Sequence, residues 1–259
     1  MSRTASISEQ GRRRSMEDAH VLLPDFGAFG WVLGAVFDGH RGSRAAAYAA
    51  GRFPQLVHQT LDSGQDGGNA LVFTLEHLGQ DLLTEPSGST AAAFLLQDKE
   101  LAAANVGDAR VVLIQDTTPR QLTRDHRVDD PDERRRILEA GGIIEGRYVM
   151  HGLSGLEPTR SLGDAGFHEA GVTFSPFVQS VARTPEDEWL IAACDGLFDF
   201  MSNQDVAEVV QGAADADEAV ERLRHEVLDI RQGTDNLTVL VVDLRHSFWT
   251  MSGRSLNAS

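Results

Sequence analysis

An apolar run ends abruptly at an acidic turn in the segment WVLGAVFDGH, which occupies residues 31–40. A short, continuous apolar run that contains valine and aromatic residues and stops at a turn signal is typical of a buried β-strand. The strand would deliver Asp38 into the turn, where Gly39 allows another group to approach the backbone closely. We therefore expect a buried strand that carries a carboxylate to its end.

Two further aspartates share this position relative to a strand. Asp195 follows the apolar run at residues 189–193, and Asp235 precedes the run at residues 237–244. Strand ends are rigid points from which several side chains can be aimed at one place. A single Asp-Gly pair is more often an ordinary turn, but three such carboxylates favour a shared site. Mg²⁺ and Mn²⁺ take oxygen ligands and keep several waters, so a few carboxylates and a carbonyl are enough to bind them.

The remaining patterns predict a mixture of strands and paired helices. Helices are expected at residues 43–61, 70–83, 131–140, 203–210 and 216–230, and further strands at 90–96, 100–106, 109–114 and 177–182. Tight turns between residues 90 and 114 predict that those three strands form an antiparallel meander. Strands and helices do not alternate strictly, so we expect an α+β fold, a four-layer α-β-β-α sandwich in which helices flank two packed antiparallel sheets.

Composition restricts the class of protein. The 259 residues contain 23 Lys and Arg against 39 Asp and Glu, a formal net charge of −16, which disfavours binding to nucleic acid or to an anionic membrane. Cys194 is the single cysteine, so an intramolecular disulfide and a cysteine-based zinc cage are excluded. Because no apolar run approaches the length of a membrane span, we expect a cytoplasmic location. We also expect a monomer. The Arg- and Ser-rich opening also resembles an organelle transit peptide, which is the weaker interpretation.

Nine short motifs resemble, in order, those of the metal-dependent protein phosphatases (the PPM or type 2C family). The resemblance covers roughly residues 5–244, and we expect a single catalytic domain at residues 1–244 followed by a C-terminal tail at residues 245–259. The motifs are Arg13 with MEDAH at 16–20, VFDGH at 36–40 with Gly42, SGSTA at 87–91, NVGDAR at 105–110, TRDHR at 123–127, Arg136-Ile137 with AGG at 140–142, TRSLGD at 159–164, ACDGLFD at 193–199 and DNLT at 235–238.

The resemblance implies a site for two Mg²⁺ or Mn²⁺ ions. Asp38 would bridge the ions, with Glu17 (through a water) and the Gly39 carbonyl on one of them and Asp195 and Asp235 on the other. A water held between two such ions loses a proton near neutral pH and becomes a nucleophile.

The same resemblance assigns three further roles. Asp125 and Asp199 would join Asp195 in a weaker third metal site. Arg13 would bind phosphate oxygens through its planar guanidinium group, and His40 would donate a proton to the departing serine or threonine oxygen. Judged without the family, Arg13 belongs to a solvated basic run, His40 is a turn residue, and Asp125 is a turn or capping residue.

The implied activity is hydrolysis of phosphoserine and phosphothreonine on protein substrates. Two rival functions remain: a phosphatase-like binding protein that has lost its metals, and a two-metal hydrolase of nucleotides or other small phosphate esters. The presence of Glu17, Asp38, Asp195 and Asp235 argues against the first rival. Residues 147–158 and 165–175 depart from the family pattern, so substrate preference is the least determined property.

Overall fold

Two five-stranded antiparallel sheets form the centre of the molecule. The computed structural model describes residues 3–27 and 30–245. The strand order of the first sheet is β1 (Thr4–Glu9), β16 (Leu237–Asp243), β15 (Asp187–Ala193), β8 (Arg110–Gln115) and β9 (Thr118–Gln121). The order of the second is β14 (Phe177–Ala182), β7 (Glu100–Val106), β6 (Ala91–Leu96), β3 (Trp31–Phe37) and β2 (Ala19–Phe26).

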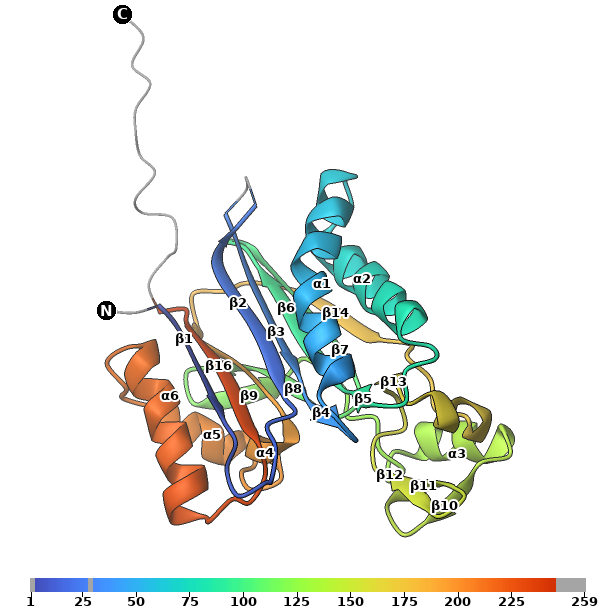
Figure 1. The fold of residues 1–259 in the computed structure, drawn as a ribbon. Helices are drawn as coiled ribbons and strands as arrows, with labels where there is room; N and C mark the ends of the chain where they lie inside the picture. The colour runs from blue at the N-terminus through green and yellow to red at the C-terminus, as the bar shows by residue number, and fades with distance from the viewer. Residues whose placement is uncertain (1–2, 28–29, 246–259) are drawn as a thin grey trace, which may run out of the picture.

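Helices cover the outer face of each sheet (Figure 1). The long helices α1 (Arg44–Asp62) and α2 (Gly67–Asp81) pack on the second sheet, whereas α4 (Asp195–Phe198), α5 (Asn203–Val210) and α6 (Ala216–His225) pack on the first. The predicted four-layer α-β-β-α sandwich is therefore confirmed. None of the helices in the described ranges is both long and apolar enough to span a membrane.

Strand β3 is apolar throughout because both of its faces are buried. Leu33, Ala35 and Phe37 pack against α1 and α2, whereas Val32 and Val36 point into the layer between the sheets. Side chains alternate across a strand, so only a strand covered on both faces needs a continuous apolar run.

The predicted meander over residues 90–114 is wrong in its last strand. Strands β6 and β7 pair as expected, but β8 belongs to the other sheet, where it pairs with β15 and β9. The turn at Gly107 and Asp108 therefore carries the chain from one sheet to the other. Strand β8 is apolar on both faces, so its sequence fits a central position in either sheet, and only the packing of the sheets decides between them.

A smaller lobe beside the sandwich escaped sequence prediction except for its helix. It contains α3 (Pro131–Glu139), the three-stranded sheet of β10 (Ile143–Glu145), β11 (Tyr148–His151) and β12 (Ser154–Leu156), and the 3₁₀-helix η1 (Ala165–Ala170). Its core is a separate small apolar cluster that includes Ile137, Val149 and Phe167. Between the lobe and the sandwich lies a short sheet of β4 (Gly39–His40), β5 (Gly88–Ser89) and β13 (Leu162–Gly163).

Element ends differ from the predictions where capping decides them. Helix α2 begins at Gly67, three residues before the predicted start, because the Asp66 side chain accepts a hydrogen bond from the Asn69 backbone. The helix predicted at 216–230 ends as α6 at His225 and continues as the π-helical turn η2 (Glu226–Ile230). Arg245 donates hydrogen bonds to Asp243, and the rest of the expected tail, residues 246–259, lies outside the described residues.

A buried carboxylate holds α3 to the segment that precedes β13. Glu133, only 2% exposed, accepts hydrogen bonds of 2.6 Å from Arg160 Nη2, Arg136 Nη2 and Thr159 Oγ1. Burial alone would raise the pKa of Glu133, but the hydrogen bonds from Arg160, Arg136 and Thr159 outweigh it and lower the pKa to about 2.

Replacement of Glu133 by glutamine should therefore destabilise the protein in a pH-dependent way. Glu133→Gln should lower the free energy of unfolding at pH 7 by about 3 kcal/mol, because two partly buried guanidinium groups lose their buried counter-charge. The folded-state pKa lies below the unfolded value, so this stabilisation is complete above about pH 4.5 and is lost as pH falls towards 2.

Urea unfolding at pH 7 and pH 3.5 measures the effect. The difference between wild type and Glu133→Gln should be smaller at pH 3.5. Glu139→Gln, at an exposed position of the same helix, is the matched control and should change stability by less than about 0.5 kcal/mol. A Glu133→Gln deficit that is equal at both pH values would contradict the assignment.

Candidate active site

A cleft of about 550 Å³ opens where the ends of strands from both sheets meet. Strands β3 and β15 end just before Asp38 and Asp195, and β16 begins just after Asp235. Seven of the nine site residues predicted from sequence line this cleft: Arg13, Glu17, Asp38, Gly39, His40, Asp195 and Asp235. The structure thus brings together carboxylates that are far apart in the chain.

Two glycines allow the strand ends to approach one another. A Cβ atom on Gly39 would lie 2.1 Å from the Glu17 carbonyl oxygen, and one on Gly196 would lie 1.9 Å from the Asn236 carbonyl oxygen. Neither position has room for a side chain. These contacts bring Glu17 beside Asp38, and Asp195 beside Asp235.

Asn236 fastens the N-terminal segment to this edge. Its Oδ1 accepts a hydrogen bond of 2.9 Å from the Glu17 backbone nitrogen, and its Nδ2 donates to the carbonyl oxygens of Gln10 at 2.8 Å and Ser15 at 3.0 Å. Both the oxygen and the nitrogen of the buried Asn236 side-chain amide therefore make hydrogen bonds. Sequence analysis quoted Asn236 within a motif but gave it no role.

The carboxylates in the cleft repel one another. Burial and the nearby charges of Asp195, Asp18 and Asp108 raise the pKa of Asp38 well above its ordinary value. Burial, with Asp108 and Asp199 nearby, raises the pKa of Asp195 to about 7. Several anions in one partly buried place are unfavourable without added positive charge.

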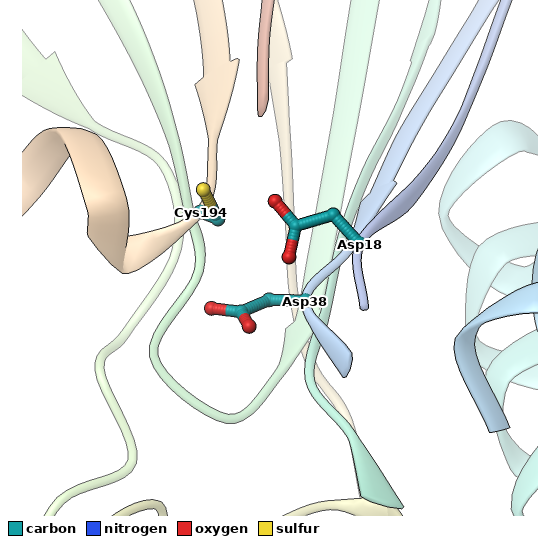
Figure 2. Close-up of side chains that lie close together, drawn as sticks. All are labelled: Asp18, Asp38 and Cys194. Atoms are coloured by element: carbon teal, nitrogen blue, oxygen red, sulfur yellow. The ribbon is translucent and has the colours of Figure 1, made fainter. Parts of the chain in front are cut away.

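Asp18 is a further carboxylate of this cluster, and it was not predicted from the sequence as a site residue. Figure 2 shows its carboxylate beside Asp38 and Cys194, and the three side chains offer ligand atoms within 4.8 Å of one another. Thr238 donates to Asp18 Oδ2 at 2.7 Å, whereas the buried Oδ1 atom has no hydrogen-bond partner among the described residues. Burial raises the pKa of Asp18 to about 6. Its place next to Glu17 in the sequence was the signal that could have identified it.

The donor set suits a hard divalent cation. It consists mainly of carboxylate oxygens with an unsatisfied buried oxygen among them, and Mg²⁺ and Mn²⁺ prefer such ligands. Cys194 does not change this preference, because burial and the nearby carboxylates raise the pKa of its thiol well above the ordinary value. This disfavours the thiolate, the form in which cysteine binds metals. Its sulfur instead accepts a hydrogen bond from the Thr238 backbone nitrogen at 3.2 Å.

Two other groups fix the orientation of Glu17. Ser15 Oγ donates to its Oε1 at 2.8 Å, and the Gly42 backbone nitrogen donates to its Oε2 at 2.9 Å. The Glu17 carboxylate is thereby held at the wall of the cleft while its lone pairs are only partly used. Such an orientation fits a ligand that acts through an intervening water.

Arg13 lies at the mouth of the cleft and pairs with Asp235. Its side chain is 61% exposed, so it is accessible to a ligand from solvent. Burial lowers its pKa, but the hydrogen bond and charge of Asp235 outweigh that effect and raise the pKa overall. Arg13 is therefore a permanent cation beside the carboxylate cluster.

Asp125 and Asp199, the remaining predicted ligands, are not among the residues that line the cleft. Arg110 Nε lies 2.9 Å from both Asp125 oxygens, and Gln121 donates to Asp125 Oδ1 at 2.7 Å. Asp199 accepts from Arg127 Nη2 at 3.0 Å. Both carboxylates therefore already pair with an arginine in this structure.

Arg127 is a cation that sequence analysis left without a role. It contacts Asp108 at 2.6 Å, Asp199 at 3.0 Å and Asp195 at 3.7 Å. It thus offsets part of the negative charge on the side of the cleft near β15. Its position in the TRDHR segment was a signal, but only the tertiary structure shows which carboxylates it reaches.

His40 faces the cleft with its side chain 23% exposed. Its Nε2 atom lies 2.5 Å from Oδ2 of Asp164, which is fully buried. The sequence places Asp164 in the TRSLGD motif but indicates no role for it. Its contact with His40 gives it a direct connection to the cleft.

Comparison with known proteins places the chain in a family. The sequence model of the family described as protein phosphatase 2C (PP2C) matches residues 2–236. The chain is 35% identical to protein phosphatase 2C homolog 1 of Saccharomyces cerevisiae, over 90% of this chain and 89% of that protein. It is also 35% identical to a protein kinase and PP2C-like domain-containing protein of rice (Oryza sativa subsp. japonica), over 93% of this chain but 39% of that protein.

A solved structure shows the same fold. The serine-threonine phosphatase 2C from Toxoplasma gondii superposes with a TM-score of 0.81 at 22% identity, over 93% of this chain and 94% of that chain. The match of the family model to nearly the whole chain, together with the identity to the yeast protein, establishes the relationship. This chain belongs to the protein phosphatase 2C family.

Proposed function

We propose that this protein hydrolyses phosphoserine and phosphothreonine monoesters on other proteins, and that the reaction requires Mg²⁺ or Mn²⁺. The observation that carries the proposal is the cluster of Asp18, Asp38, Asp195 and Asp235, whose mutual repulsion calls for bound cations. Family membership supports a phosphoprotein substrate. The three apolar layers that join the sheets and helices support one catalytic domain at residues 1–244.

The carboxylates would hold two ions, with Asp38 shared between them. Glu17 and the Gly39 carbonyl would complete the site of one ion, and Asp195 and Asp235 the site of the other. When bound, the ions lower the pKa of a water so that it becomes the nucleophile, and they offset phosphate charge. Asp18, directly behind Asp38, would fix the orientation of the bridging carboxylate.

The arginine and histidine of the cleft would act on the phosphate ester itself. Arg13 is exposed at the mouth and carries a planar set of donors, so it can bind two phosphate oxygens at once. His40 lies in the wall beside Gly39 and can donate a proton to the oxygen that leaves. Binding and proton donation are thus supplied by two different elements of the cleft.

The third ion would use Asp125 and Asp199 together with Asp195. Arg110 and Gln121 hold Asp125, and Arg127 holds Asp199, so binding of this ion would have to displace existing hydrogen bonds. The proposed third site is for that reason weaker than the other two.

The first prediction tests activity and metal dependence together. With Mn²⁺, the protein should release phosphate from a phosphothreonine peptide faster than from a phosphotyrosine peptide or a nucleotide, and chelation should abolish the activity. Asp195→Asn should lower turnover by more than about 100-fold, because it weakens an ion site directly. Phosphate release and Mn²⁺ calorimetry are the measurements.

A stability measurement separates loss of metal from loss of fold. Asp195→Asn removes one of the mutually repelling carboxylates, so the metal-free variant should be at least as stable to urea as the metal-free wild type. Added Mn²⁺ should stabilise the wild type more than the variant. Full activity after exhaustive chelation, or near-normal turnover of Asp195→Asn, would show that the metal centre is misplaced.

The second prediction isolates the third site. Asp125→Ala should leave two ions bound, because Asp38, Glu17 and Asp235 are unchanged, and should still slow peptide hydrolysis. Calorimetry with Mn²⁺ counts the bound ions, and steady-state kinetics gives turnover. Loss of the two-ion signal would instead make Asp125 a structural partner of Arg110 or a ligand of the first sites.

The third prediction concerns proton donation by His40. A serine or threonine alkoxide is a poor leaving group that needs a proton, whereas nitrophenolate leaves without one. His40→Ala should therefore slow hydrolysis of a phosphothreonine peptide on the order of 10²-fold or more, and hydrolysis of p-nitrophenyl phosphate far less. Equal losses that are partly restored by more Mn²⁺ would indicate that His40 merely supports the Asp38-Gly39 turn.

A further inference from the structure

The short sheet of β4, β5 and β13 brings His40 and Asp164 together across a glycine. His40 is paired with Gly88, and Gly88 with Gly163, which directly precedes Asp164. A Cβ atom on Gly88 would lie 2.0 Å from Asp164 Oδ2 and 2.2 Å from His40 Nε2. The contact between the carboxylate and the imidazole therefore occupies the space that any side chain at position 88 would need.

The Asp164 carboxylate is fully buried and cannot easily turn away from His40. Its Oδ2 accepts hydrogen bonds of 2.5 Å from both His40 Nε2 and Ser161 Oγ, and its Oδ1 accepts one of 3.2 Å from Arg41 Nη1. Its backbone has φ of 53°, a left-handed conformation that is uncommon outside glycine. The Asp164 backbone nitrogen donates to the Ser87 carbonyl oxygen at 3.1 Å, which helps to hold that conformation.

We propose that Asp164 is a positioning residue for His40, and that it makes Nδ1 the ring nitrogen that donates the proton to the leaving group. An ionised carboxylate can only accept hydrogen bonds, so its neighbour Nε2 carries a hydrogen. No described residue makes a hydrogen bond to Nδ1 that would compete with a substrate oxygen. This inference rests on the proposed function. It adds that Asp164 orients His40, the proposed general acid, and that Nδ1 is the atom that donates the proton.

The proton transfer balances as follows. The attacking water forms a new O–P bond and loses a proton to solvent, while the bond between phosphorus and the Ser or Thr Oγ breaks with its electron pair on Oγ. Oγ takes the proton from Nδ1 of protonated His40, which leaves a neutral ring whose remaining hydrogen is on Nε2, facing Asp164. Solvent then returns a proton to Nδ1. Asp164 neither gains nor loses a proton in these steps.

Asp164→Asn tests the proposal because the amide should reverse the tautomer of His40. Arg41 can only donate, so it should draw the amide oxygen to the Oδ1 position and place the NH₂ group against Ser161 and His40. Nε2 must then accept, and the hydrogen of the neutral ring moves to Nδ1. The ring also loses the carboxylate that holds its orientation.

The expected result is selective for the leaving group. Asp164→Asn should lower kcat on a phosphothreonine peptide by at least about tenfold and change kcat on p-nitrophenyl phosphate by less than about twofold. In a His40→Ala background the same substitution should have no further effect on the peptide, because the two residues act as one unit. The number of Mn²⁺ ions bound by calorimetry should stay the same.

Asp187→Asn is the matched control. Asp187 is also a buried aspartate and accepts hydrogen bonds from Gln115 and the Thr184 backbone, but it does not line the cleft. Its replacement should change the two activities by the same factor. Equal losses on both substrates for Asp164→Asn, or an additional loss in the His40→Ala background, would overturn the proposal and leave Asp164 a structural residue.

A spectroscopic measurement on the wild-type protein tests the contact without relying on catalytic activity. Long-range ¹H–¹⁵N spectra, with His40 assigned by comparison with His40→Ala, should show a hydrogen on Nε2. A His40 ring whose Nε2 lacks a hydrogen would refute the role of Asp164. If the wild type hydrolyses neither substrate, the proposed function fails, whereas the spectrum still decides whether Asp164 orients His40.

Discussion

Electrostatic repulsion between carboxylates is the constraint on which the rest of this structure depends. Asp38, Asp195 and Asp18 lie where the two sheets meet, and burial together with mutual repulsion raises their pKa values. On a flexible surface loop, such side chains would move apart into water. Here they are held in place by rigid strand ends and by glycines that have no room for a Cβ atom. The hydrogen bonds of Asn236 to Glu17 and Gln10 add to this restraint. The stability of the sandwich therefore maintains an arrangement that is locally unfavourable.

Arginines offset this charge without removing it. Arg127 reaches Asp108 and Asp199, Arg13 pairs with Asp235, and Arg110 holds Asp125. The carboxylates at the centre of the cleft, Asp38 and Asp18, have no ion pair with an arginine or lysine in the described part of the chain. The protein thus neutralises the edge of the cluster and leaves its centre available to a cation.

A series of contacts that runs from α3 to His40 connects the small lobe with the sandwich. Glu133 holds Arg160 and Thr159, Ser161 donates to Asp164, and Asp164 contacts His40. Buried charges that are fully hydrogen-bonded resist rearrangement, because breaking one bond leaves an unpaired charge. A side chain in the cleft is in this way held by contacts that begin in α3.

The resemblance of short motifs named seven residues that meet in the cleft. The sequence by itself determined the fold class and, within the described ranges, five of the six α-helices and seven of the ten strands in the two main sheets. Apolar runs that end at Asp38 and Asp195, or begin after Asp235, carry this information locally. It could not place β8 in its sheet, because a strand that is apolar on both faces fits either one. Nor could it show that Asp164 contacts His40 or that Arg110 holds Asp125, since such pairs depend on distances between segments that only the packed sheets bring together.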